Sequence, residues 1–139
     1  MSIELEKGVT TYYNSKQGDE YFTINGKKTN FQIKEFACKD GSDLIKIDDE
    51  LVEKLQILRF YFASPIIINS GYRTVAYNKQ VGGVDNSQHV LGKACDIVIK
   101  GHSPEEVGAI AKKIGFMGVG IYPTFVHVDT RSTPSYWRG

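Results

Sequence analysis

Apolar residues at helical spacing predict two main helices. The first series follows an acidic run at 48–50 and consists of Leu51, Leu55, Leu58 and Phe62. Acidic residues favour a helix N-terminus, and the apolar series would bury one face of the helix. The second helix begins at 103–106, where the sequence Ser-Pro-Glu-Glu combines a capping serine, a proline at the first helical position and a glutamate three residues after the cap. We therefore expect helices over 49–62 and 104–114, and a shorter one over 75–81.

Short apolar runs between these helices predict strands. The continuous runs at 66–68 and 97–99 are typical of buried strands. Segments 116–122 and 125–130 predict two more strands, joined by a turn at Pro123-Thr124. Alternation places His127 and Asp129 on the same face of the last strand. The pattern predicts an α+β fold, in which a small antiparallel sheet carries the functional residues and the two main helices pack on it.

The first 30 residues are polar and dotted with glycine, and they predict a separate N-terminal extension. Segments 10–13 and 21–24 could form short strands, and Asn25-Gly26 is a hairpin-turn signal. We divide the chain into this extension, residues 1–30, and a main domain, residues 31–139. The extension could be a hairpin packed on the core, an interdomain linker or a substrate-positioning flap, and we expect the hairpin.

Composition describes an ordinary globular protein with few special features. The chain has 139 residues, 41% hydrophobic residues and a net charge of +1, without a basic run that would favour nucleic acid. It also lacks an apolar segment long enough to span a membrane, and its N-terminus lacks the apolar core of a signal peptide. We expect a monomer that binds neither nucleic acid nor membrane. Cys38 and Cys95 are interpreted as free thiols, with a disulfide between them as the alternative.

The segment 87–96 contains the strongest candidate chemistry. It offers an imidazole at His89 and a carboxylate at Asp96, and His127 on the predicted strand offers a second imidazole. Nitrogen and oxygen donors of this kind suit zinc, and three protein ligands leave a fourth position open for water, as in catalytic sites. The alternative is that these are ordinary hydrogen-bonded residues, as we interpret His102 in its polar turn.

The same segment resembles a known family. The pattern Ser87-x-His89-x-x-Gly92-x-Ala94-x-Asp96 is similar to the signature of the D-Ala-D-Ala carboxypeptidase family of zinc peptidases, which includes vancomycin-resistance dipeptidases and phage endolysins. Segments upstream and downstream also resemble that family in the same order, so the resemblance spans roughly residues 31–137. It implies a Zn²⁺ site at His89, Asp96 and His127, a peptidoglycan stem peptide as substrate, and action at the bacterial cell wall. Because no signal peptide is visible, we expect a phage lysin released through a membrane pore or a domain of a longer protein.

Other residues near this pattern are candidates for catalysis and substrate binding. Arg73 follows a buried strand in a Ser-Gly-Tyr-Arg-Thr turn, and a guanidinium offers a rigid fork of donors to a carboxylate or oxyanion. The resemblance implies that Arg73 stabilises the transition state. We expect Tyr72, Ser87 and Gln88 to contact substrate, with core packing as the alternative for Tyr72.

The general base is where the sequence departs from the family. Many members of the family have an acidic residue three positions before the second zinc histidine, and some related enzymes have a histidine two positions before it. Here those positions hold Thr124 and Phe125, which cannot accept a proton from water. Asp129 is the nearest carboxylate, and it could be the base or could accept an N–H of a ligand histidine and fix its tautomer. Asp85 is a weaker alternative base.

Two classes of function follow. The first is a zinc peptidase that cuts peptidoglycan, either as a carboxypeptidase releasing D-Ala or as an endopeptidase cutting within the stem or cross-bridge. The second is a zinc-binding module without hydrolysis, similar to the hedgehog signalling domain. Thr124 at the usual base position favours the module, whereas Arg73 beside an open ligand set favours the enzyme, which is our interpretation. A purely structural zinc site is a third possibility, disfavoured because only three protein ligands are apparent.

Overall fold

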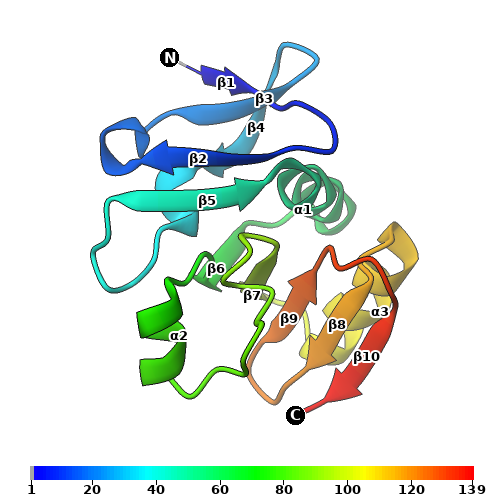
Figure 1. Ribbon diagram of the computed structural model, residues 1–139. Helices are drawn as coiled ribbons and strands as arrows, with labels where there is room; N and C mark the ends of the chain where they lie inside the picture. Colours follow the sequence, from blue (N-terminus) through cyan, green and yellow to red (C-terminus); the bar gives the residue numbers. More distant parts are fainter. Residues whose placement is uncertain (1) are drawn as a thin grey trace.

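The computed structural model describes residues 2–139, which form ten strands and three α-helices (Figure 1). The helices are α1 (Asp49–Phe62), α2 (Val75–Gln80) and α3 (Pro104–Ile114). The strands are β1 (Ser2–Glu4), β2 (Thr10–Asn14), β3 (Tyr21–Ile24), β4 (Lys27–Gln32), β5 (Leu44–Asp48), β6 (Ile66–Ser70), β7 (Ala94–Ile99), β8 (Gly118–Ile121), β9 (Val126–Asp129) and β10 (Ser135–Arg138). Single-turn 3₁₀ helices lie at Ser15–Gln17 and Ile33–Phe36. The expected α+β class is confirmed.

The largest sheet carries the strands that we predicted from the apolar runs. Its order is β10-β8-β9-β7-β6, and all pairs are antiparallel except β10 with β8. The expectation of one antiparallel sheet is therefore corrected in two respects. β9 ends beside the start of β8, and residues 130–134 cross to the other side of β8, so β10 starts at the same end as β8 and pairs with it in parallel. Two smaller sheets, β1-β3-β4 and β2-β5, also lie within the described residues.

Residues 2–30 share strand pairing and the hydrophobic core with the rest of the chain. β2 pairs antiparallel with β5, and β3 and β4 form a hairpin closed by Asn25 and Gly26, both with positive φ (52° and 76°) as the two-residue turn requires. Phe22 and Phe31, 0% and 1% exposed, belong to the same hydrophobic cluster as the buried face of α1. The boundary that we expected at residue 30 falls within β4.

The main helices have the limits that the sequence indicated, because their ends are defined locally. Ser103 caps α3 by accepting the backbone N–H of Glu106, and Gly115 ends it in a left-handed conformation. Both helices contribute to the core beside the largest sheet. Cys38 and Cys95 are buried free thiols. Across residues 2–139, no helix combines the length and apolar character needed to cross a membrane.

Candidate metal centre

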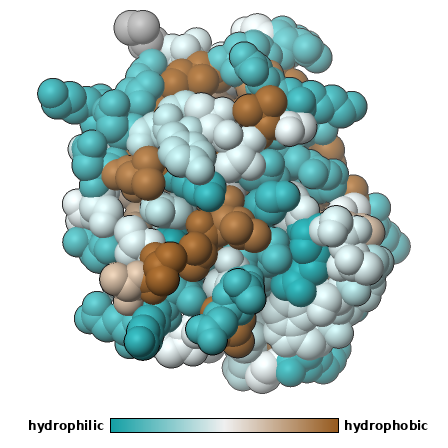
Figure 2. Space-filling model, in the orientation of Figure 1, coloured by the Kyte–Doolittle hydropathy of each residue, from teal (hydrophilic) through white to brown (hydrophobic). Residues whose placement is uncertain are grey.

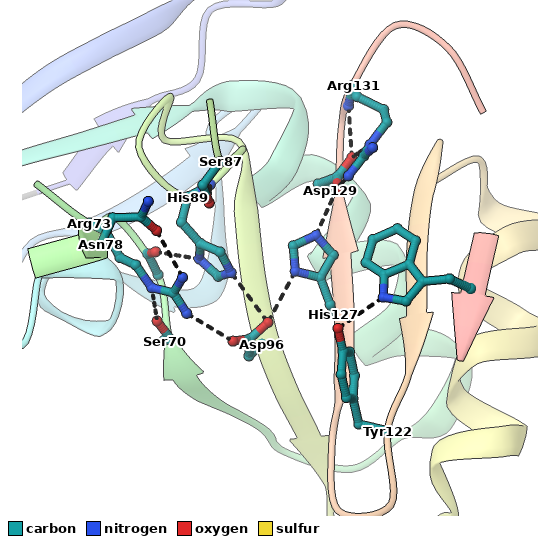
Figure 3. A network of polar contacts seen from close by, with 12 residues as sticks. Ser70, Arg73, Asn78, Ser87, His89, Asp96, Tyr122, His127, Asp129 and Arg131 are labelled. Carbon is teal, nitrogen blue, oxygen red and sulfur yellow. Dashed lines mark hydrogen bonds and ion pairs between the residues drawn. The ribbon is translucent and has the colours of Figure 1, made fainter. Parts of the chain in front are cut away.

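His89, Asp96 and His127 meet on one face of the largest sheet (Figure 3). Asp96 on β7 pairs in register with His127 on β9, so the two side chains emerge side by side. His89 comes from the turn that precedes β7. One ligand atom from each of the three residues lies within 4.8 Å of the other two. The Asp96 Oδ1 atom lies 3.3 Å from His89 Nε2 and 3.1 Å from His127 Nδ1.

Hydrogen bonds on the far side of each imidazole determine which nitrogen faces Asp96. His89 Nδ1–H donates to the carbonyl oxygen of Gly71 (2.8 Å), which leaves the lone pair on Nε2. His127 Nε2–H donates to Asp129 Oδ2 (2.7 Å), which leaves the lone pair on Nδ1. Partners of this kind are typical of metal-ligating histidines. Two imidazole lone pairs and a carboxylate thus face one point, a donor set that fits zinc with a fourth position open.

Charges in the site show that this point favours a cation. Burial would lower the pKa of His127, but its hydrogen bonds with Asp129 and Asp96 outweigh burial and raise it. Burial would raise the pKa of Asp96, but the contacts of its carboxylate with His127 and His89 outweigh burial and hold the pKa well below its usual range. A positive charge between these groups, whether a proton or a metal ion, relieves the repulsion of lone pairs that face one another.

Arg73 lies on the other side of Asp96. Its guanidinium donates to Asn78 Oδ1 (3.1 Å), to Ser70 Oγ (3.3 Å) and to Asp96 Oδ2 (3.5 Å). The Arg73 backbone N–H also donates to the His89 carbonyl oxygen (3.1 Å), which connects the segment after β6 to the turn that carries His89. One Asp96 oxygen therefore faces the histidines and the other faces Arg73.

Asp129 is fully buried and already surrounded by donors. Besides His127, it accepts from Arg131 Nη2 (2.6 Å), Arg131 Nε (2.8 Å) and the Arg131 backbone N–H (3.1 Å). Burial would raise the pKa of Asp129, but the bonds from Arg131 and His127 hold it well below its usual range. The Asp129 carboxylate is thus an ionised acceptor directed at His127 and Arg131.

A cavity of about 580 Å³ opens above the three residues. Their side chains lie at its floor, and Ser87, Gln88 and Arg73 also line it. The wall formed by strands β8–β10 and their connections carries aromatic rings from Tyr122, Phe125 and Trp137, and the opposite side is the loop of residues 81–88.

Figure 2 shows hydrophobic residues crossing the middle of the viewed face near α2, with hydrophilic residues around them. Val75 at the start of α2 is exposed, as are Val84 and Leu91 between α2 and β7. Apolar groups therefore lie close to the cavity as well as within it.

Several of these residues differ from the expectations made from sequence. Tyr72 is buried and is not among the residues that line the cavity, and burial raises the pKa of its phenol. Asn78, Arg131 and Trp137 were missed as site residues. Asn78 lies in a short helix without any motif. Trp137 is the single tryptophan of the chain and lies in segment 131–139, for which the sequence left open packing near the cavity or an exposed tail; it lines the cavity.

Comparisons with known proteins identify the family. Over 111 residues the chain is 33% identical to the probable peptidoglycan L,D-endopeptidase MepK of Haemophilus influenzae. This match covers 73% of the chain and 59% of that protein. Over 45 residues the chain is 44% identical to the zinc D-Ala-D-Ala carboxypeptidase of Streptomyces albus G. This second match covers 32% of the chain and 18% of that protein. The chain thus spans less than two thirds of either relative. The Peptidase M15 family matches residues 27–129, which include His89, Asp96 and His127, and the chain therefore belongs to the Peptidase M15 family.

Proposed function

We propose that this chain is a zinc-dependent peptidase that hydrolyses peptidoglycan stem peptides or cross-links at the bacterial cell wall. The observation that carries the proposal is the convergence of His89 Nε2, Asp96 Oδ1 and His127 Nδ1 on the floor of an open cavity beside Arg73. Family membership and the names of two relatives, both peptidases and one named for peptidoglycan, support the reaction and the substrate.

Each residue has a role that follows from its contacts. His89, Asp96 and His127 would hold Zn²⁺, which when bound supplies an acidified water and polarises the scissile carbonyl. Arg73 orients Asp96 and lies where its remaining N–H groups can steady negative charge on the substrate oxygen. Ser87 accepts the His89 backbone N–H, and Gln88 lines the cavity where substrate would contact it.

Of the two roles considered for Asp129, its contacts favour holding His127. A general base needs a free lone pair directed at the reacting water, whereas Asp129 is 0% exposed and accepts four hydrogen bonds. Asp129→Asn distinguishes the roles. If Asp129 holds His127, the variant should bind zinc more weakly and should recover its turnover at saturating zinc. If Asp129 is the general base, the variant should bind zinc with unchanged affinity and lose its turnover.

An endopeptidase is the first candidate within this class. The match with the L,D-endopeptidase covers 73% of the chain, compared with 32% for the carboxypeptidase. The carboxypeptidase remains the second candidate, because its shorter match is the more identical of the two.

Digestion of purified peptidoglycan and of free stem pentapeptide, followed by mass spectrometry, tests the proposal. We expect chelator-sensitive fragments cut within the stem or cross-bridge, and D-Ala release would indicate the carboxypeptidase instead. His89→Ala should abolish the products. His102→Ala, whose ring bonds to Glu106 away from the cavity, is the matched control and should retain them. Bound zinc without any product would mean a non-catalytic zinc-binding module.

A further inference from the structure

The C-terminal strand β10 places an aromatic ring against His127. The centroid of the Trp137 ring lies 5.1 Å from that of His127, at an interplanar angle of 46°. The indole Nε1–H donates to the Tyr122 hydroxyl (2.9 Å), which holds the indole ring in place. Trp137 therefore packs on the imidazole from the side of the sheet edge.

Arg131 links this ring to the carboxylate behind His127. Its guanidinium carbon lies 5.3 Å from the centroid of the Trp137 ring. Its Nε–H donates to Asp129 Oδ1 and its Nη2–H donates to Asp129 Oδ2. A planar fork of this kind fixes the carboxylate plane as well as its charge. Asp129 in turn accepts His127 Nε2–H, so the contacts form a closed ring of side chains around one imidazole.

Two glycines of β8 make room for this arrangement. Gly118 pairs in register with Asp129, and Gly120 pairs with His127. A Cβ atom at Gly118 would overlap the Asp129 carboxylate, and one at Gly120 would overlap the Trp137 indole. Val119 between them is fully buried in the core on the other face. The Gly-Val-Gly sequence therefore keeps one face of β8 free of side chains where the two groups lie.

We propose that Gly118, Gly120, Arg131 and Trp137 form a buttress that holds the His127 imidazole with Nδ1 directed at Asp96. Imidazole rings rotate readily unless their surroundings prevent it, and a ring held in the ligating orientation binds a metal more tightly than one that must be ordered first. Arg131 and Trp137 lie outside the residues 27–129 that the family matches, whereas Gly118 and Gly120 lie within them. The inference rests on the proposed zinc site.

Zinc affinity, measured by competition with a chromophoric chelator, tests the buttress directly. We expect Trp137→Ala to weaken zinc binding about 10- to 100-fold, as loss of groups that orient metal ligands does elsewhere. Gly120→Ala should weaken it as well, because the new methyl group displaces the indole without deleting it. Trp137→Phe keeps an aromatic ring in the same place and should restore most of the affinity.

Tyr136→Ala is the matched control. Tyr136 neighbours Trp137 on β10, is 47% exposed and contacts Lys112, away from the cavity. This variant should bind zinc as the wild type does. The visible spectrum of the Co²⁺-substituted protein should change in Trp137→Ala and stay unchanged in Tyr136→Ala, because the spectrum reports ligand geometry and is insensitive to global stability.

The outcomes separate the buttress from the metal site itself. Wild-type zinc affinity and cobalt spectrum in both Trp137→Ala and Gly120→Ala would overturn the buttress. Undiminished zinc affinity in His89→Ala would overturn the site on which the buttress rests. Thermal unfolding of each metal-free variant shows that it is folded at the temperature of the titration, so weaker binding there supports the buttress and is not a consequence of unfolding.

Discussion

At the residue scale, the site depends on glycines where two backbone segments approach closely. Gly92, between His89 and Asp96, has φ +73°, and a Cβ there would lie 2.5 Å from the Lys46 carbonyl oxygen. Gly71 is in a similar position, because a Cβ there would lie 2.8 Å from the Phe36 carbonyl oxygen. The glycine of the metal-binding segment is thus required by packing against β5 as well as by its conformation.

Gly92→Ala should lower the free energy of unfolding by about 2 kcal/mol or more, since a left-handed alanine costs about 1–2 kcal/mol before the clash is added. Gly101→Ala is the control, because Gly101 has φ +86° with open space around its Cβ position. Urea unfolding of the two variants measures the difference. Equal losses would mean that the Lys46 contact relaxes at no cost.

Arg73→Ala should reduce turnover about 100-fold, the usual loss when one donor to a developing oxyanion is removed. Arg73 is close to Asp96, whereas Arg138 is exposed on β10 and pairs with Glu105. Arg138→Ala is therefore the control, with turnover expected at the wild-type value. Steady-state kinetics at saturating zinc measure both. An Arg73→Ala enzyme with full turnover would remove this residue from the mechanism.

Glu35→Gln should alter the pH dependence of stability. Burial raises the pKa of the Glu35 carboxyl, even though that carboxyl accepts the Gln32 backbone N–H. As pH rises, the Glu35 carboxyl loses its proton in the unfolded chain before it does so in the folded chain. The stabilisation of the folded state by the protonated carboxyl is therefore complete below about pH 4.5 and is lost as pH rises through the raised pKa of the folded state. Urea unfolding at several pH values from about 4 to 7 should show a shallower loss of stability in the variant. Parallel curves would contradict the assignment.

At the element scale, the register of β7, β8 and β9 assembles the site. The β7–β9 pairing sets Asp96 opposite His127, and the β8–β9 pairing sets the two glycines beside Asp129 and His127. A shift of one residue in either pairing would turn these side chains to the core face. The N-terminal elements support this arrangement from a distance, because β5 pairs with β2 and contacts the turn at Gly92.

Phe22→Ala tests whether the N-terminal elements are integral to the fold. Phe22 is 0% exposed and packs edge-on against Tyr13 and Phe36, so its truncation should cost about 3–5 kcal/mol of unfolding free energy. Tyr12, 62% exposed on β2, provides the control Tyr12→Ala, for which we expect the free energy of unfolding to change by no more than about 0.5 kcal/mol. Denaturant unfolding measures both. A separate early transition for residues 1–30 would show that they fold as an independent extension.

At the scale of the whole molecule, we expect binding of a metal at the proposed site to be coupled to folding. The three proposed ligands come from a turn and two strands that are brought together only in the folded chain. A ligand present at 100 times its Kd stabilises the native state by about 2.7 kcal/mol, which corresponds to a rise in Tm of about 10 °C for a domain of this size. Zinc should produce this rise in the wild type and none in His127→Ala, as measured by differential scanning calorimetry. An equal rise in both proteins would place the metal elsewhere.

The sequence by itself determined the features that depend on neighbouring residues. Capping at Ser103, apolar spacing along 49–62 and the alternation in 125–130 predicted both main helices and the face of β9 that carries His127 and Asp129. These patterns are readable because helix ends, buried faces and strand faces follow from periodicity and capping within a few residues. The spacing of His89 and Asp96 likewise identified two side chains that the fold brings together.

Only the tertiary structure decided how those side chains are held. The tautomer of His89 depends on the carbonyl of Gly71, 18 residues away. The parallel pairing of β10, which brings Trp137 to His127, also has no local signal. Such contacts join segments that are distant in sequence, and they are specified by strand register and packing. No periodicity along the chain encodes them.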